Sequence, residues 1–302
     1  MSLTAVILIL ISAVSHAGWN ILGKRQNPSI SFFLVTNIFG TLLFSPIIIY
    51  HFNQVLILPP TLWFYLAASG FCLAVYFSGL AGAYRAGDMS IVYPLARSSP
   101  VLVVTFVTLV LGRGNQITLQ SVCGILLVVS GCFLVPLLRF GDFQPRNYLN
   151  ATCLLALLAA LGTAGYSIID DEALRTLRAA EGLTIDTITR TLVYGCLQGG
   201  FTVFWLGLSA LLIPSERARL RRVIAVNKTA AVLTGGLMFM TYALVLISLG
   251  YVRNVSYVVA FRQVSILVGT LFSVLFLKER LYRPRLIGVM VIFMGLVLVG
   301  TG

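Results

Sequence analysis

The stretch His16-Ala-Gly-Trp-Asn-Ile-Leu22 recurs in altered form, 147 residues further along the chain, as Thr163-Ala-Gly-Tyr-Ser-Ile-Ile169. Both stretches lie at the ends of apolar runs long enough to cross a bilayer, which takes about 20 residues of helix. The further matches, in the same order along the two halves, are Arg97 with Arg262, Gly124 with Gly288, and Gly131 with Gly295. The repeated stretch, the arginine pair and the two glycine pairs in one order indicate an internal duplication.

The composition excludes a soluble globular protein. Of the 302 residues, 59% are hydrophobic and 10% are charged, whereas about a quarter of a soluble domain is charged. Mean hydropathy is +0.98. Because lipid offers no partners for backbone polar groups, apolar runs of this length are expected to be helices. We predict an all-α integral membrane protein with ten transmembrane helices, at about Leu3–Gly23, Phe32–Tyr50, Leu62–Tyr84, Met89–Leu111, Ile117–Leu138, Leu149–Ile169, Thr191–Ile213, Thr229–Gly250, Val255–Leu277 and Leu286–Thr301.

The repeat determines how the two halves relate. Five spans per half is an odd number, so the second half must enter the membrane upside down relative to the first. We therefore expect two inverted five-helix repeats, residues 1–140 and residues 147–302. Inverted repeats are common in secondary transporters, where one repeat can gate one side of the membrane and its twin the other side.

The basic residues indicate orientation. A formal charge of +12 could suggest a nucleic-acid partner, but the Lys and Arg residues lie in short gaps between apolar runs, so we expect no nucleic acid. Fourteen of them lie in the odd-numbered gaps and five in the even-numbered gaps. Because the more basic side faces the cytoplasm, we predict outward-facing termini and a cytoplasmic surface helix at Ser215–Lys228, capped by Ser215, in a multi-pass protein of the inner (plasma) membrane.

Several features together resemble the EamA family of the drug/metabolite transporter superfamily. They are the five-plus-five pattern, the Ala-Gly-aromatic motif late in spans 1 and 6, Phe276-Leu-Lys-Glu-Arg280 after span 9, and the spaced glycines of span 10. The resemblance implies a transporter whose spans 1, 3, 4, 6, 8 and 9 line a central cavity, with spans 5 and 10 outside it. Many members of the family have cytoplasmic termini, which is opposite to the orientation that the charge count predicts.

Two arginines are the strongest candidates for ligand binding. Arg97 and Arg262 are the only charged residues within the ten predicted spans, and each lies about 12–14 Å into its helix at 1.5 Å per residue. A cation at that depth costs at least about 2.5–3.5 kcal/mol and normally faces a cavity or a partner. No Asp or Glu lies at this depth in the predicted spans, so an anionic or zwitterionic ligand would neutralise them. The alternative is a structural role, in which both arginines bind backbone carbonyls.

Polar and aromatic residues accompany these arginines. His16 and Trp19 lie on one polar face of span 1, and the side chain of His16 could carry a coupling proton. The alternatives are a neutral, hydrogen-bonded histidine and a helix-packing seam. The tyrosines that could form an amphipathic binding cavity together with them, or else serve only in packing, are Tyr76, Tyr93, Tyr166, Tyr242 and Tyr257.

Other chemistries lack the residues they need. There is no nucleotide-binding fingerprint, and the two histidines and five dispersed cysteines fit neither a metal site nor a disulfide framework, so we expect no cofactor and no metal. The paired glycines Gly124/Gly131 and Gly288/Gly295 are interpreted as helix-packing surfaces.

The sequence therefore favours a secondary active transporter rather than an enzyme. We expect it to move a small organic solute, such as an amino acid or a related anionic or zwitterionic metabolite, across the lipid bilayer by alternating access, as a monomer or homodimer. The alternatives are a membrane enzyme or binding protein acting on a lipid headgroup, with His16 as base, and a membrane scaffold without transport activity.

Overall fold

The structure is a computed structural model that describes residues 2–24, 29–86, 89–114, 117–135, 137–142, 151–226, 228–277 and 282–302. For some helical residues, Tyr93 and Arg97 among them, it describes the backbone alone. This part of the chain is helical and contains no strand. Its elements are α1 (Leu3–Lys24), α2 (Ile30–Phe44), α3 (Pro46–Tyr50), α4 (Phe52–Leu56), α5 (Pro60–Ala86), α6 (Met89–Val110), α7 (Leu119–Leu134), η2 (Phe140–Asp142), α8 (Ala151–Ala179), α9 (Thr187–Leu212), α10 (Pro214–Val226), α11 (Lys228–Ser248), η4 (Leu249–Tyr251), α12 (Val255–Phe261), α13 (Val264–Leu277) and α14 (Arg283–Thr301).

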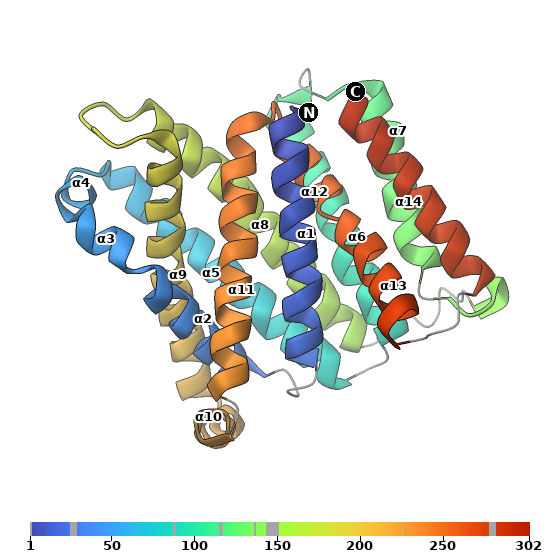
Figure 1. Cartoon of the computed structure of the whole chain (residues 1–302), viewed down its shortest axis with the longest axis horizontal. Helices are drawn as coiled ribbons and strands as arrows, with labels where there is room; N and C mark the ends of the chain where they lie inside the picture. The colour runs from blue at the N-terminus through green and yellow to red at the C-terminus, as the bar shows by residue number, and fades with distance from the viewer. Residues whose placement is uncertain are drawn as a thin grey trace.

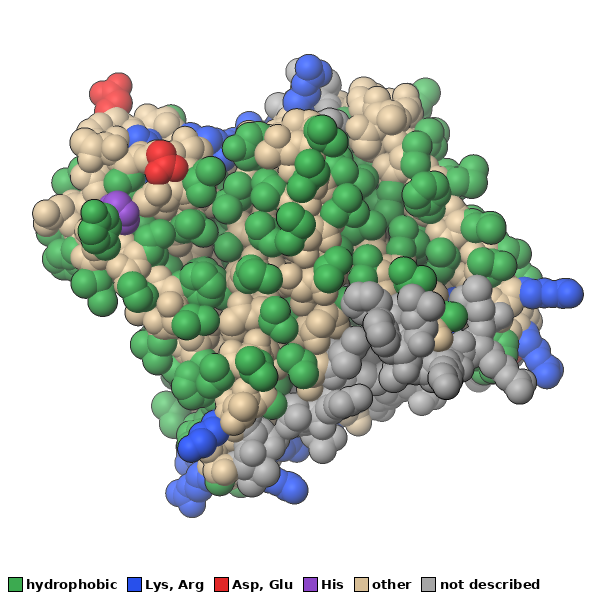
Figure 2. Space-filling model, in the orientation of Figure 1, with side chains coloured by type: hydrophobic (Ala, Val, Ile, Leu, Met, Phe, Trp, Pro, Cys, Tyr) green, Lys and Arg blue, Asp and Glu red, His purple; other side chains and the backbone are tan. Residues whose placement is uncertain are grey.

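The helices have the length and surface of membrane spans. Within the described residues, six segments are long and apolar enough to cross a bilayer: Ile30–Tyr50, Pro60–Ala83, Ala151–Ala179, Thr187–Leu212, Lys228–Tyr251 and Arg283–Thr301. Shorter apolar helices lie beside them at Leu3–Trp19, Ser98–Val110, Leu119–Leu134 and Val255–Leu271. Hydrophobic side chains cover the middle of the face shown in Figure 2, and Lys and Arg lie toward its edges. The prediction of an all-α integral membrane protein is confirmed, whereas ten crossings and inverted repeats stay predictions.

The two ends of the helix assembly differ. The N- and C-termini lie near each other at the end where α12 begins, and α10 lies across the opposite end (Figure 1). Ser2 and Ser215, at these two ends, are both exposed. We call these the terminus end and the α10 end.

Three differences from the predicted helix boundaries bear on the site and on the ends of the molecule. α8 continues to Ala179 instead of ending at Ile169, because partners inside the protein bind Asp170 and Asp171, the first two of its three acidic residues. The predicted span Val255–Leu277 is interrupted between α12 and α13. Backbone N–H groups there donate to carbonyls three residues earlier, as in a 3₁₀-helix, instead of four residues earlier. α10 begins at Pro214, a residue suited to the first helical position, so Ser215 lies inside the helix instead of capping it.

The glycines expected to pack helices together do so. α7 lies against α14, as Figure 1 shows. A Cβ atom on Gly124 would lie 2.7 Å from the carbonyl oxygen of Gly295, and one on Gly131 would lie 2.7 Å from the carbonyl oxygen of Gly288. Such distances leave no space for a side chain, so these glycines allow the two backbones to touch.

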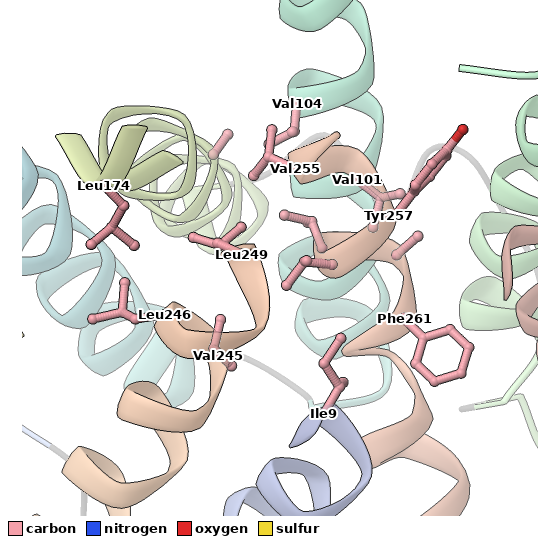
Figure 3. Packing of buried hydrophobic residues seen from close by; sticks show 14 of the residues in the cluster. Ile9, Val101, Val104, Leu174, Val245, Leu246, Leu249, Val255, Tyr257 and Phe261 are labelled. Carbon is pink, nitrogen blue, oxygen red and sulfur yellow. The ribbon is translucent and has the colours of Figure 1, made fainter. Parts of the chain in front are cut away.

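The core beneath the terminus end is mainly aliphatic. Val101 and Val104 of α6 pack toward Val255 of α12, and Leu174 of α8 lies near Leu246 of α11 (Figure 3). These residues are almost completely buried, so they hold α6, α8, α11 and α12 together around the polar site described next.

Candidate functional site

A cavity lies among α1, α2, α5, α8, α9 and α11, with Arg262 contributing from the break between α12 and α13. The cavity has a volume of about 70 Å³, which is room for roughly five waters or a small organic molecule. Its walls include residues of α2 and α9, which the family resemblance does not place at the cavity. The described residues Ala96 and Pro100 of α6, the expected span 4, line a smaller cavity beside it instead. The lining residues are His16, Trp19, Thr36, Asn37, Gly40, Thr41, Leu73, Tyr76, Phe77, Tyr166, Gly195, Gln198, Gly199, Gly235, Met238, Phe239, Thr241, Tyr242 and Arg262.

Arg262 is the charged residue of this lining. Its Nη1 donates a hydrogen bond to the hydroxyl oxygen of Tyr166 over 3.2 Å, and its Cζ lies 6.0 Å from the centre of the Tyr166 ring. Arg262 also lines two smaller cavities beside the main one, both shared with His16. The guanidinium can therefore be reached from several directions within the protein.

Aromatic rings form a continuous wall beside the guanidinium. The ring of Tyr166 stands edge-on to Tyr242 at 5.7 Å and to Tyr76 at 6.2 Å, measured between ring centres. Across the cavity, His16 and Trp19 are in edge contact at 4.8 Å. Such walls offer both ring faces and polar edges to a ligand.

A buried carboxylate that the sequence analysis missed lies directly behind this wall. Asp170 of α8 is 1% exposed and accepts hydrogen bonds from Ser69 Oγ at 2.5 Å, from the Tyr194 hydroxyl at 2.7 Å and from the Tyr242 hydroxyl. Gln198 Nε2 donates to Ser69 Oγ at 3.0 Å and to the Tyr242 hydroxyl at 3.1 Å. The carboxylate is also near enough to Arg262 for an electrostatic interaction.

This arrangement corrects the expectation that no acidic residue accompanies the buried arginines. Run length places Asp170 in a loop, because an acidic pair ends the apolar run. Helical spacing contains the missing signal, since Tyr166, Asp170, Leu174 and Leu177 fall on one face of a continuing helix and are all buried.

Six of the nine residues proposed from the sequence line the cavity: His16, Trp19, Tyr76, Tyr166, Tyr242 and Arg262. Tyr257 does not, because α12 turns its ring into the apolar core, where its hydroxyl accepts a hydrogen bond from the Thr118 backbone N–H at 3.4 Å (Figure 3). The side chains of Tyr93 and Arg97 lie outside the described part of the structure, so their relation to the cavity stays a prediction.

Ion pairs connect helices at the terminus end. Arg113, just after α6, donates to Glu172 at 2.6 Å and to Asp171 at 3.4 Å, and Arg175 donates to Asp171 at 3.0 Å. The hydrogen bond to Glu172 raises the pKa of the Arg113 guanidinium. These contacts connect the end of α6 to α8.

A second ion-pair cluster lies at the α10 end. Glu216 of α10 is buried, and its Oε1 accepts from Arg85 at 2.8 Å and from Arg219 at 2.6 Å. Its Oε2 accepts from the Ser31 backbone N–H at 3.0 Å. The segment was predicted only as a surface helix, but through Glu216 it joins α10 to α2 and α5.

The described residues contain no group of three or more His, Cys, Asp or Glu placed to hold a metal ion. The cavity offers a guanidinium, an imidazole, hydroxyls and rings. These groups are suited to binding a small molecule that carries a negative charge.

The fold, with its membrane-length apolar helices, is that of a multi-pass membrane protein, and a cavity lined by Arg262, His16 and aromatic rings lies inside it. Residues 3–137 match the model of the EamA-like transporter family, which is part of the drug/metabolite transporter superfamily. Members of the family are membrane transporters.

One of the solved structures with a similar fold is described only as "Crystal structure of protein". It aligns with a TM-score of 0.67 and 17% identity over 98% of this chain and 97% of that chain, which shows a shared fold. No curated protein matches the chain.

Proposed function

We propose that this protein is a secondary active transporter that carries a small carboxylate-bearing solute, such as an amino acid or a related metabolite, by alternating access across the inner (plasma) membrane. The observation that carries the proposal is the Arg262 guanidinium on the wall of a buried, aromatic-lined cavity. A planar guanidinium can bind a carboxylate through two parallel hydrogen bonds.

The surroundings of Arg262 favour a zwitterion over a simple cation. Tyr166 is its hydrogen-bond partner within the described part of the chain, and the oxygen of a hydroxyl leaves the positive charge of the guanidinium in place. The rings of Tyr76, Trp19 and Phe77 offer faces that attract an ammonium group. An amino acid presents both groups, a carboxylate for Arg262 and an ammonium for the rings.

Helix packing supports the proposed inverted repeat. If the first half corresponds to the second in order, α1 is paired with α8, α2 with α9, α5 with α11, α6 with α12–α13, and α7 with α14. If every helix is replaced by its counterpart, each helix contact predicts an equivalent one. The contact of α5 with α8 predicts a contact of α11 with α1, and the contact of α5 with α9 predicts a contact of α11 with α2. Both members of each pair of contacts are present, and the contacts of α7 with α14 and of α2 with α9 exchange into themselves. Residues 1–140 and 147–302 would then form the two gating units.

Counterflow in proteoliposomes tests the proposal. Vesicles loaded with unlabelled L-leucine, L-glutamate or succinate are diluted into trace labelled compound, and a carrier accumulates the label transiently without an imposed ion gradient. We expect counterflow for at least one of these carboxylates and none for L-leucinamide, which lacks the carboxylate. Absence of counterflow for all three carboxylates would contradict the proposal.

Variants of Arg262 separate binding from stability. Losing a charge-assisted hydrogen bond costs about 1.5–3 kcal/mol, so Arg262→Ala should weaken affinity about 10- to 100-fold while the protein still folds. Arg262→Lys should be impaired less, because lysine keeps the charge but loses the planar fork. Arg221→Ala, on the exposed surface of α10, is the matched control. Unchanged affinity with a lowered melting temperature would mean that Arg262 only supports the fold.

A further inference from the structure

Asp170 is a buried charge without a salt-bridge partner in the described part of the chain. The ion pairs there involve Asp171, Glu172 and Glu216 but not Asp170. Burying a carboxylate is costly unless hydrogen bonds stabilise it or a proton neutralises it. The environment of Asp170 therefore has to be compatible with one of these two states, or with both.

The chemistry of its partners suits both states. Ser69, Tyr194 and Tyr242 come from α5, α9 and α11, and each presents a hydroxyl. A hydroxyl can donate to a carboxylate and, after rotation, accept from a protonated carboxyl group, whereas Lys or Arg could only donate. The cluster can thus hold Asp170 with or without a proton, and no backbone movement is needed for the change.

Tyr242 connects this cluster to the cavity. Its hydroxyl donates to Asp170, its oxygen accepts from Gln198, and both Tyr242 and Gln198 line the cavity. If Asp170 carries the proton and donates it to the Tyr242 oxygen, the hydroxyl hydrogen of Tyr242 is released and can turn toward a ligand. Protonation also removes a negative charge near Arg262, which makes the cavity more attractive to a carboxylate.

We propose that Asp170 is the coupling-proton site of this transporter, and that proton binding at Asp170 and binding of the solute carboxylate at Arg262 strengthen each other. This inference rests on the proposed function and goes beyond it by naming the coupling ion, its site and the sign of the coupling. It transfers the role considered for His16 in the sequence to a carboxylate on α8.

Several other ionisable groups surround Asp170. Cys72 of α5 is close enough to interact electrostatically with Asp170, and Tyr194 and Tyr242 face it from α9 and α11. Arg262 faces it from the break between α12 and α13, and Tyr166 and Asp171 share its own helix. Of these groups, Asp171 is the other carboxylate, which makes it the natural control.

The first test needs no ligand. Infrared titration of the purified protein follows the carbonyl stretch of protonated carboxyl groups, and we expect one component of this band to be present in the wild type and lost in Asp170→Asn. Asp171→Asn should keep this component, because Asp171 binds Arg113 and Arg175 instead of the hydroxyl cluster. If the wild-type and Asp170→Asn titrations coincide, Asp170 takes up no proton and the proposal is overturned.

The second test measures affinity for L-leucine, and for succinate in parallel, as a function of pH. Coupling between sites is typically worth a factor of about 5–150, so wild-type affinity should rise at least fivefold as pH falls through the Asp170 titration. Asn resembles the protonated form, so Asp170→Asn should bind with the high affinity at every pH tested, and Asp171→Asn should follow the wild type.

A third variant guards against misfolding of Asp170→Asn. Tyr194→Phe removes one donor to the carboxylate without touching the cavity lining. Because that donor favours the charged form, the midpoint of the pH dependence should move upward by about one pH unit. A purely structural tyrosine would leave the midpoint unchanged, and that result would count against the proposal.

The remaining outcomes are decisive as well. The proposal is overturned if affinity falls in acid. It is also overturned if the pH dependence survives in Asp170→Asn, because it then belongs to His16 or another group. A dependence on Na⁺ that Asp170→Asn abolishes would overturn it as well. If the wild type binds neither L-leucine nor succinate at any pH and shows no counterflow with L-glutamate, the proposed function is overturned and the coupling with it. Proton binding by Asp170 would still be decided separately, by the infrared titration.

Discussion

Replacing Gly295 with alanine should push α14 and α7 apart. The new Cβ atom would lie 2.6 Å from the carbonyl oxygen of Gly124 and 2.8 Å from the backbone nitrogen of Val128, whereas ordinary van der Waals contact begins at 3.4 Å. Both neighbours are backbone atoms, so no side-chain rotation can relieve the overlap. α14 and α7 must therefore separate locally by several tenths of an ångström.

The cost follows from what holds membrane helices together. Lipid is as apolar as the side chains, so close packing between backbones is a main source of helix association. Overpacking of this kind typically costs about 1–3 kcal/mol. At about 2–4 °C per kcal/mol, the melting temperature should fall by about 2–12 °C.

A thiol-reactive dye that becomes fluorescent as buried cysteines such as Cys196 are exposed can follow thermal unfolding in detergent. Gly200→Ala is the matched control: Gly200 lies within α9, and no atom lies within 4 Å of the site of its Cβ. Alanine favours helix over glycine by about 1 kcal/mol, so the control should match or exceed the wild-type melting temperature. Equal melting temperatures for Gly295→Ala and Gly200→Ala would refute the close contact of α7 with α14.

Three further changes test the ends of the molecule. Glu216→Gln should lower the free energy of unfolding by about 1–2 kcal/mol. This amount is small because Arg85 and Arg219 are more than one-third exposed, so water weakens their ion pairs with Glu216. A melting temperature equal to that of the wild type would contradict the role of Glu216 in joining α10 to α2 and α5. Asp186 caps α9, and hydrogen bonds from Thr189 lower its pKa, so its contribution is present at neutral pH and lost as pH falls through that lowered value. Asp186→Ala should therefore melt below the wild type at neutral pH, with a difference that shrinks in acid; a constant difference would show that the charge is irrelevant. Single cysteines at Ser2 and Ser215 in a cysteine-free background test the orientation in the membrane. We expect only the cysteine at Ser2 to react with a membrane-impermeant reagent from outside. Labelling of the cysteine at Ser215 alone would contradict the predicted outward-facing termini.

Much of the fold follows from apolar run length. The boundaries of α1, α5, α6 and α11 lie within a few residues of those expected, because the cost of exposing backbone to lipid decides where a helix begins and ends. The prediction from apolar run length was wrong for the end of α8, because it assumes that every acidic residue is exposed. Asp170 and Asp171 continue the helix because hydroxyls bind the first and arginines bind the second.

The site was predictable where a side chain belonged to a polar stripe on one helix. His16 and Trp19 share a face of α1, and both line the cavity. Tyr257 shows the limit of this reasoning, because its distance along the chain from Arg262 does not say which way its ring points once the helix breaks. Asp170 depends on residues from three other helices, and no spacing within one segment shows such a group.

The break between α12 and α13 also determines how the lower part of this segment can move. Arg262, the residue that caps the end of α12, still donates its backbone N–H to the carbonyl of Val258, and α13 begins two residues later. α13 is about 20 Å long at 1.5 Å per residue, so a tilt of about 10° around the break would carry its far end by about 3.5 Å. In such a tilt each residue moves in proportion to its distance from the break, and Arg262 lies next to the break. The α10 end could therefore widen or narrow around a bound carboxylate while the guanidinium keeps its position.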